Sequence, residues 1–262
     1  MVFGWKKRRA AKTQTEAGTQ PEETGENQSP SIAAMKRAIA DHEAEDPMIR
    51  AVMTAKDLTT NALNWFKDDR GVRVESVLGG LGALAGFCAA YDVAERVAEG
   101  RLKAEMPGVV IVDLKDGTRF WFGDEINAYL AENPHSIWSL TVGMAQKLGA
   151  TELPDHHEIF RRVAGAIGGE GFGIADLPAE HMPGDSAQNF AREMFPVAAK
   201  VLRHYDLPRG QWPLAVAISI QEIMEMAQDE LDPAMMVRIV MEMAIPASKF
   251  DPETLLAGQA AA

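Results

Sequence analysis

The spacing of apolar residues along the chain predicts a protein built mostly from helices. From residue 31 to residue 258, apolar side chains recur every three or four positions, the spacing of helices that bury one face. The predicted helices cover about 31–45, 47–67, 72–99, 124–132, 136–148, 155–167, 186–205, 212–230 and 232–246. Pro196 is expected to kink or divide the helix that contains it. We therefore expect a mostly α (α+β) fold, a multi-helix globular domain over 31–258.

A strand pattern occurs in one place, residues 109–122, and it predicts a central β-hairpin. Two runs of β-branched and aromatic residues flank an Asp116-Gly117 pair, which is a strong signal for a hairpin turn. A lone two-stranded ribbon is marginal in water, so it must pack on helices or pair with another edge. If the body divides into two subdomains, we expect them to meet near 100–124.

The second strand of this hairpin carries candidate binding residues. Alternation places Phe120 and Phe122 on one face, and Arg119 and Trp121 on the other. Either both faces belong to the core, or Trp121 is exposed beside Arg119, a pair enriched in binding surfaces.

The helix over 72–99 carries a stripe of small residues. Gly79, Gly82, Gly86 and Ala90 are spaced three or four apart, although each interior glycine costs roughly 1 kcal/mol relative to alanine. Such a stripe predicts the close approach of another backbone. That backbone belongs to a second helix of the same chain, to a second copy in a homodimer, or to a ligand.

The two ends of the chain differ from its body. Residues 1–30 are poor in apolar side chains and are expected to form a disordered basic and polar tail, and 259–262 a frayed C-terminus. The first nine residues, MVFGWKKRR, place two aromatic rings beside four cations. Weak peripheral contact with a membrane is therefore the alternative to a solvated tail.

Composition limits the class of protein. The net charge is −12, and the tail holds five basic and four acidic residues, so the body is acidic and general nucleic-acid binding is not expected. The single cysteine, Cys88, excludes an internal disulfide and favours a reducing compartment. The longest uncharged run, Val77–Tyr91, is shorter than the ~20 residues that span a bilayer. These features predict a soluble, cytoplasmic protein.

The Asp155-His156-His157 tripeptide resembles a signature of a phosphoesterase superfamily. That family also uses aspartates at strand ends, whereas this tripeptide opens a predicted helix. Asp155 followed three residues later by Glu158 fits a capping box, which we favour. No strong catalytic, nucleotide or metal motif is present, and no cofactor or metal is expected.

The long connection over 168–185 is the second candidate region, because compact domains seldom carry such loops without a function or disorder. Its glycines fit a helix C-terminus with left-handed conformations, or a hinge beside a pocket. It also supplies Glu170, His181 and Asp185, which form either a solvated acidic loop or an acid–base or metal site.

The C-terminal helices are rich in methionine, which fills irregular cores or lines adaptable binding grooves. Together the patterns favour a binding or interaction module that uses the aromatic hairpin and the Met-rich helices. Its partner would be another protein or a second copy of the chain, as a homodimer. The alternative is an enzyme or small-ligand sensor with its site under the 168–185 loop.

Overall fold

The computed structural model describes residues 30–257, so the predictions for 1–29 and for the extreme C-terminus lie outside the described residues. The helices are α1 Pro30–His42, α2 Ile49–Trp65, α3 Val74–Ala98, α4 Asp124–Asn127, α5 Ile137–Lys147, α6 His156–Ala166, α7 Ala187–His204, α8 Trp212–Met226, α9 Pro233–Ala247 and α10 Pro252–Ala257. The strands are β1 Lys67–Asp68, β2 Gly71–Val72, β3 Val110–Asp113 and β4 Arg119–Phe122. The predicted mostly helical fold with a central hairpin is confirmed.

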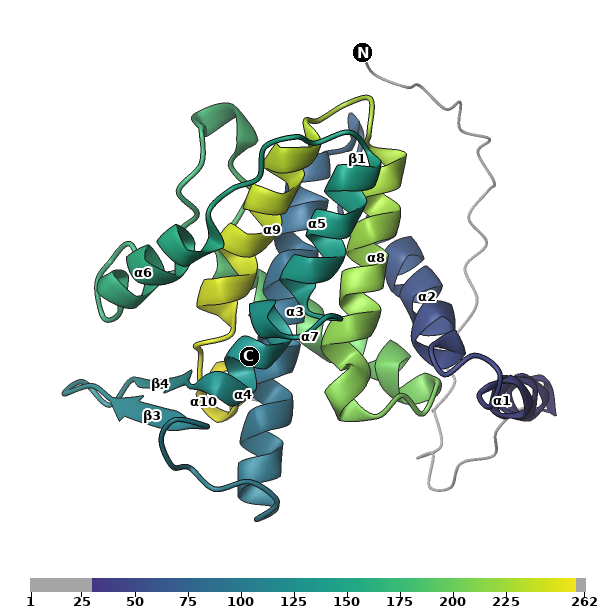
Figure 1. Cartoon of the computed structure of the whole chain (residues 1–262), viewed down its shortest axis with the longest axis horizontal. Helices are drawn as coiled ribbons and strands as arrows, with labels where there is room; N and C mark the ends of the chain where they lie inside the picture. The colour runs from purple at the N-terminus through teal and green to yellow at the C-terminus, as the bar shows by residue number, and fades with distance from the viewer. Residues whose placement is uncertain (1–29, 258–262) are drawn as a thin grey trace, which may run out of the picture.

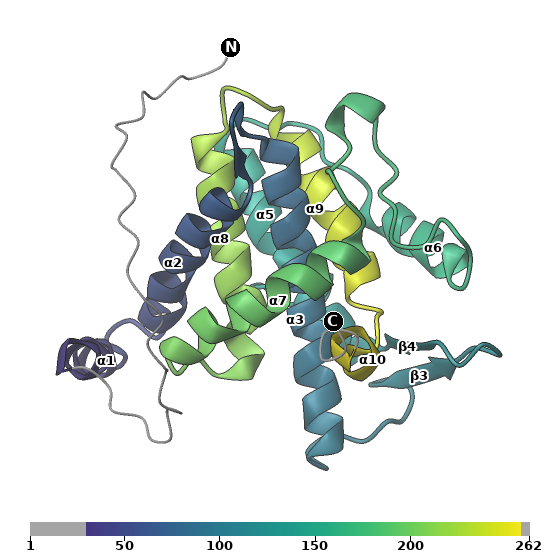
Figure 2. The same ribbon diagram turned by 180° about the vertical axis from the view of Figure 1, so that it is seen from behind.

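Helix α3 forms the centre of the bundle, and Figure 1 shows α9, α5 and α8 on one side of it. Figure 2 shows α7 crossing its opposite side, with α2 beside α7 and α8. Every residue of α3 from Val77 to Ala90 is buried, because the helix is apolar around its whole circumference. Its length and hydropathy would suffice to cross a bilayer, but 89% of its most apolar window is buried in the bundle, as in a core helix.

The small-residue stripe of α3 lies against α9, so the intramolecular explanation is confirmed. A Cβ atom on Gly82 would lie 2.6 Å from the carbonyl oxygen of Val240, and one on Gly86 would lie 2.0 Å from that of Ala244. Both distances are shorter than van der Waals contact. The homodimer seam and the ligand surface are therefore wrong at Gly82 and Gly86, which the backbone of α9 covers, and at Gly79, which Pro183 of the same chain covers.

The buried face of α2 does not follow its large apolar residues. The large apolar residues Ile49, Val52 and Met53 are only half-buried, and the buried positions are mostly small. They are Ala51, Thr54, Ala55, Leu58, Thr59 and Ala62. The hydroxyl of Thr59 lies 2.9 Å from that of Ser219, so a polar pair in the core fixes α2 against α8. Polar contacts of this kind are invisible to a prediction based on hydrophobic spacing.

The methionines of the last two long helices belong to the core. Met224 of α8 and Met236, Met241 and Met243 of α9 are fully buried, as the core interpretation predicted. The alternative, a Met-lined binding groove on these helices, is wrong for these four residues. Only Met226, at the end of α8, is strongly exposed among the methionines of α8 and α9.

Several local features differ from the predicted pattern. Helix α7 continues undivided through Pro196, since its apolar face packs along α3. The helix that begins at Asp124 changes to a π-helical turn over Ala128–Glu132. The pairing of the two-residue strands β1 and β2 and the short helix α10 were not predicted.

Candidate functional site

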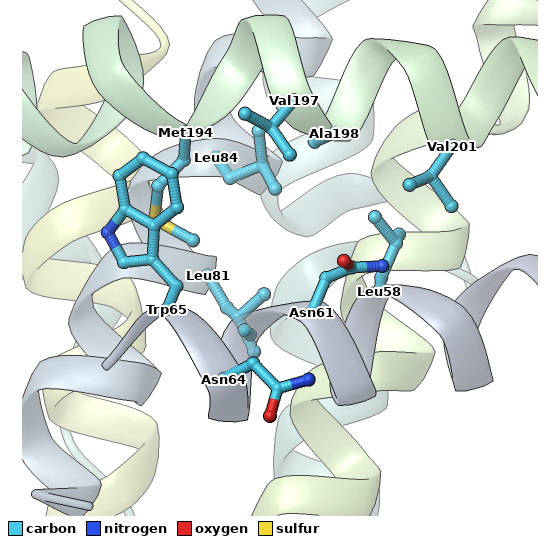
Figure 3. Close-up of a pocket in the computed structure, with 11 residues that line it drawn as sticks. Leu58, Asn61, Asn64, Trp65, Leu81, Leu84, Met194, Val197, Ala198 and Val201 are labelled. Carbon is cyan, nitrogen blue, oxygen red and sulfur yellow. The ribbon is translucent and has the colours of Figure 1, made fainter. Parts of the chain in front are cut away.

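A groove lies between α2 and α7, with α3 as its floor (Figure 3). Its volume is about 270 Å³. The lining residues are Leu58, Asn61, Ala62, Asn64 and Trp65 of α2, Leu81 and Leu84 of α3, and Met194, Val197, Ala198 and Val201 of α7. Positions 58, 61, 62 and 65 and positions 194, 197, 198 and 201 follow the same i, i+3, i+4, i+7 spacing. Each wall is therefore one stripe of a helix.

Both ends of the groove are closed by contacts that hold α2 and α7 apart. At one end the rings of Phe66 and Phe190 meet edge to face, with centroids 5.6 Å apart. At the other end the hydroxyl of Tyr205 donates to a carboxylate oxygen of Asp57 at 2.7 Å. Asp57 of α2 and Phe66 directly after it lie nine positions apart, which corresponds to about 13 Å of helix. The open stretch therefore matches roughly two turns of a ligand helix.

The groove has an apolar interior and an accessible rim. Leu81 and Leu84 on the floor are 1% exposed, whereas Trp65 is 48% exposed and Val197 is 40% exposed. The side chain of Trp65 stands over the groove beside Met194 (Figure 3). Asn61 and Asn64 add amide groups at the edge, which can bond a polar backbone or side chain. The lining carries no charged side chain, so the site suits an apolar ligand.

The structure places the two predicted residues of the hairpin in different environments. Arg119 is on the surface and pairs with Asp113 across the hairpin at 2.7 Å. Trp121 is only 6% exposed, and its indole N–H donates to Asp251 at 2.9 Å. The alternative with an exposed Trp121 is therefore wrong, and the core interpretation holds at this residue. The segment that follows α9 covers it.

The outer edge of β4 is also occupied within the chain. The amide of Trp121 donates to the carbonyl oxygen of Lys249 at 2.9 Å, and Phe120 bridges to Phe250. At Trp121 the hairpin therefore pairs with a segment of its own chain, and this amide does not need the edge of another molecule.

The three predicted residues of the 168–185 loop do not come together. Glu170 is exposed. His181 lies 3.3 Å from Glu75 of α3. Asp185 accepts bonds from the backbone of Ser186 and the side chain of Asn189, at the start of α7. Within residues 32–257, no three His, Cys, Asp or Glu side chains gather closely enough to hold a metal ion.

The cap of α6 and the glycines that follow it agree in part with the prediction. Asp155 caps α6, but its carboxylate accepts from the amide of His157, one position earlier than a capping box requires. Gly168, directly after this helix, has a φ of +76°, and Gly173 has a φ of +83°. Both adopt the left-handed conformation expected for a helix C-terminus and its loop.

A charged pocket of about 490 Å³ does lie under part of the loop, between α6 and α9. At its base, Glu242 is 1% exposed and accepts bonds from Arg162 and from the backbone amide of Asp176. Burial raises the pKa of Glu242 above its ordinary value, against the lowering effect of these partners. Arg238 donates to the carbonyl oxygen of Asp176 at 3.0 Å, so the pocket also ties the loop to α9.

Sequence reasoning did not identify the groove. The signal was present, because Leu58, Trp65, Val197 and Val201 continue the apolar arcs of their helices. A stripe of this spacing indicates burial but does not say whether a neighbouring helix covers it. Comparison with known proteins finds no matching family model, no matching curated protein and no matching solved structure. The geometry of the described residues therefore carries the functional argument.

Proposed function

We propose that this protein is a binding module that holds an apolar helical segment of a protein partner in the α2–α7 groove. The observation that carries the proposal is the combination of a buried leucine floor with an exposed tryptophan rim. Apolar grooves between two helices are a common way to recognise an amphipathic helix. Tryptophan is among the residues that most often contribute strongly to binding at protein interfaces.

The dimensions of the groove define the ligand. A volume of about 270 Å³ is slightly below the usual range for drug-sized ligands, but it suits a few apolar side chains. Two side chains spaced four residues apart on one helix span about 6 Å, which fits within the closed ends. The ligand is thus a short amphipathic helix with paired leucine-sized residues.

Fluorine NMR of the full chain labelled with 5-fluorotryptophan tests this function directly. Trp65→Phe assigns the resonance of Trp65, and the probe is a twelve-residue amphipathic helix with leucines four positions apart. We expect the Trp65 resonance to shift on titration and that of the buried Trp212 to stay in place.

Val197→Asp should abolish this shift, since it puts a charge on the exposed groove wall. Val112→Asp is the matched control, because Val112 is similarly exposed but lies on the distant hairpin (Figures 1 and 2). A Trp65 resonance that does not move, or one that moves equally in Val197→Asp, contradicts the proposal.

The charged pocket supports a second candidate, the binding of a small zwitterion such as a free amino acid. Arg238 and Arg161 offer guanidinium groups for a carboxylate, and Glu158 and Asp176 offer carboxylates for an ammonium group. Calorimetric titration with free amino acids tests it, with Arg238→Ala as the variant that should lose binding. Heats that are absent, or that persist in Arg238→Ala, exclude this candidate.

A further inference from the structure

The groove between α2 and α7 lies beside the first helix of the described chain. Tyr205, which closes one end of the groove, is followed directly by Asp206. The carboxylate of Asp206 pairs with the ammonium group of Lys36 in α1 at 2.8 Å. Helix α1 starts at Pro30, about 9 Å of helix before Lys36. Residues 1–29 therefore join the body of the protein close to this end of the groove.

The segment before α1 carries its large apolar side chains far from the helix, at the start of the chain. They are Met1, Val2, Phe3 and Trp5, which we call the N-terminal cluster. The four cations Lys6–Arg9 follow directly. From residue 10 to residue 29, the apolar side chains are alanines and one proline. Within residues 1–29, an apolar groove thus has one matching ligand, the N-terminal cluster.

The length of chain between this cluster and α1 is sufficient to reach any part of the groove. Residues 10–29 are twenty positions, which span at most about 70 Å when extended. The groove is about 13 Å long between its closed ends. A ligand on the same chain binds intramolecularly, so dilution does not weaken it as it weakens the binding of a separate partner.

The chemistry of the N-terminal cluster suits the groove. The lining carries no charged side chain, its leucine floor is buried, and its rim exposes Trp65 and Val197. Aromatic rings remove apolar surface from water when they enter such a space, and they pack favourably against an exposed indole.

We propose that the first nine residues of this chain dock in the α2–α7 groove through Phe3 and Trp5 and compete there with a partner helix, an inference that rests on the proposed function. Gly4 lies between the two aromatic residues and disfavours a helix. The segment is therefore a weaker ligand than an amphipathic helix with paired leucines, which displaces it. Lys6–Arg9 stay outside the uncharged lining, where the acidic body of the protein attracts them.

Two deletions in the chain labelled with 5-fluorotryptophan test the proposal. Removal of residues 2–9 deletes the cluster and the cations. Removal of residues 13–20 is the matched control, because it also deletes eight residues but leaves Phe3 and Trp5 in place. Without any ligand, we expect the Trp65 resonance to shift in the first deletion and to stay in place in the second. The double variant Phe3→Ala/Trp5→Ala should reproduce the first deletion, since apolar contacts hold the segment.

The twelve-residue amphipathic helix is then titrated into each protein. It should bind at least about threefold more tightly after removal of residues 2–9, as for a groove that the segment occupies in two thirds of the molecules. The control deletion should bind it with the affinity of the full chain.

The outcomes separate this inference from the proposed function. A helix that binds the full chain and both deletions equally, with the Trp65 resonance unchanged between them, overturns the docking of the segment and leaves the proposed function in place. A helix that binds none of these proteins contradicts the proposed function, while the Trp65 resonance without ligand still decides the docking. A difference in this resonance that grows with protein concentration shows that a second copy supplies the segment, and it overturns docking within one chain.

Discussion

Two helix pairs in this protein show opposite ways of using small and large residues. Between α3 and α9, Gly82 and Gly86 let the backbones touch, so the interface is sealed. Between α2 and α7, the Phe66–Phe190 ring pair and the Asp57–Tyr205 bond act as spacers, and a groove remains. The distance between packed helices depends on the side chains at the contact. Here small residues give a closed interface between α3 and α9, whereas large residues leave an accessible groove between α2 and α7.

The largest effect on stability is expected from a larger side chain in the sealed α3–α9 interface, which has no room for one. Gly86→Ala places a methyl group 2.0 Å from the carbonyl oxygen of Ala244, where backbone atoms have to move. We expect it to lower the free energy of unfolding by at least about 3 kcal/mol, measured by urea denaturation. Gly143→Ala in α5 is the control, because nothing lies within 4 Å of the added methyl group. That control should raise stability by up to about 1 kcal/mol, and equal effects would contradict the sealed interface.

A slightly smaller effect on stability is expected from removing one of the contacts that close the groove between α2 and α7. Phe190→Ala deletes one ring of the Phe66–Phe190 contact and should cost about 2–3 kcal/mol of unfolding free energy. Because the walls lose their separation at this end, the affinity for the amphipathic helix should fall in the same variant. A variant that loses stability but binds the helix unchanged would show that the ring pair does not define the groove.

The buried Lys249 lies directly beyond the end of α9, and the effect of its charge on stability depends on pH. The pKa of Lys249 is about 8 in the folded protein and near 10.5 when unfolded, so between these values the unfolded chain binds more protons. The wild-type free energy of unfolding should therefore rise from pH 8 to pH 10.5 through this group. Lys249→Met should stabilise the protein by about 2 kcal/mol below pH 8, and the gain should vanish near pH 10.5. A gain that is constant with pH would show that burial of the charge is not its cause.

The smallest effect on stability is expected at the rim of the groove. Trp65 is 48% exposed, so Trp65→Ala should lower the free energy of unfolding by less than about 1 kcal/mol. Binding of the amphipathic helix should nevertheless weaken at least tenfold, as for an aromatic residue at a binding hot spot. A large loss of stability without a loss of affinity would place Trp65 in the core instead.

The features that could be predicted from the sequence are those that depend on nearby residues. Asp116-Gly117 marks the hairpin, Ser136, Ser186 and Asp232 each cap a helix, and the glycine spacing of 72–99 shows a close backbone contact. These signals lie within a few residues of the structure they determine.

The groove and the burial of Trp121 depend on residues far apart in the chain. Trp65 faces Met194 across the groove, and Asp251 binds the indole of Trp121 from 130 positions away. Periodicity shows that a side chain has an apolar neighbour but does not identify the element that supplies it. For this reason the sequence predicted binding residues on the hairpin and not the α2–α7 groove, whereas the helical class was predicted correctly.

The apolar circumference of α3 has a consequence for the synthesis of the protein. Its principal partner, α9, begins at Pro233, well after α3 ends at Ala98. At about 5–20 residues per second, a ribosome needs roughly 7–27 seconds to cover that interval. Throughout it the face of α3 that carries Gly82 and Gly86 lacks the helix that covers it in the folded protein. Factors that shield apolar segments during translation should therefore determine the yield of this protein more than they do for proteins with neighbouring core elements.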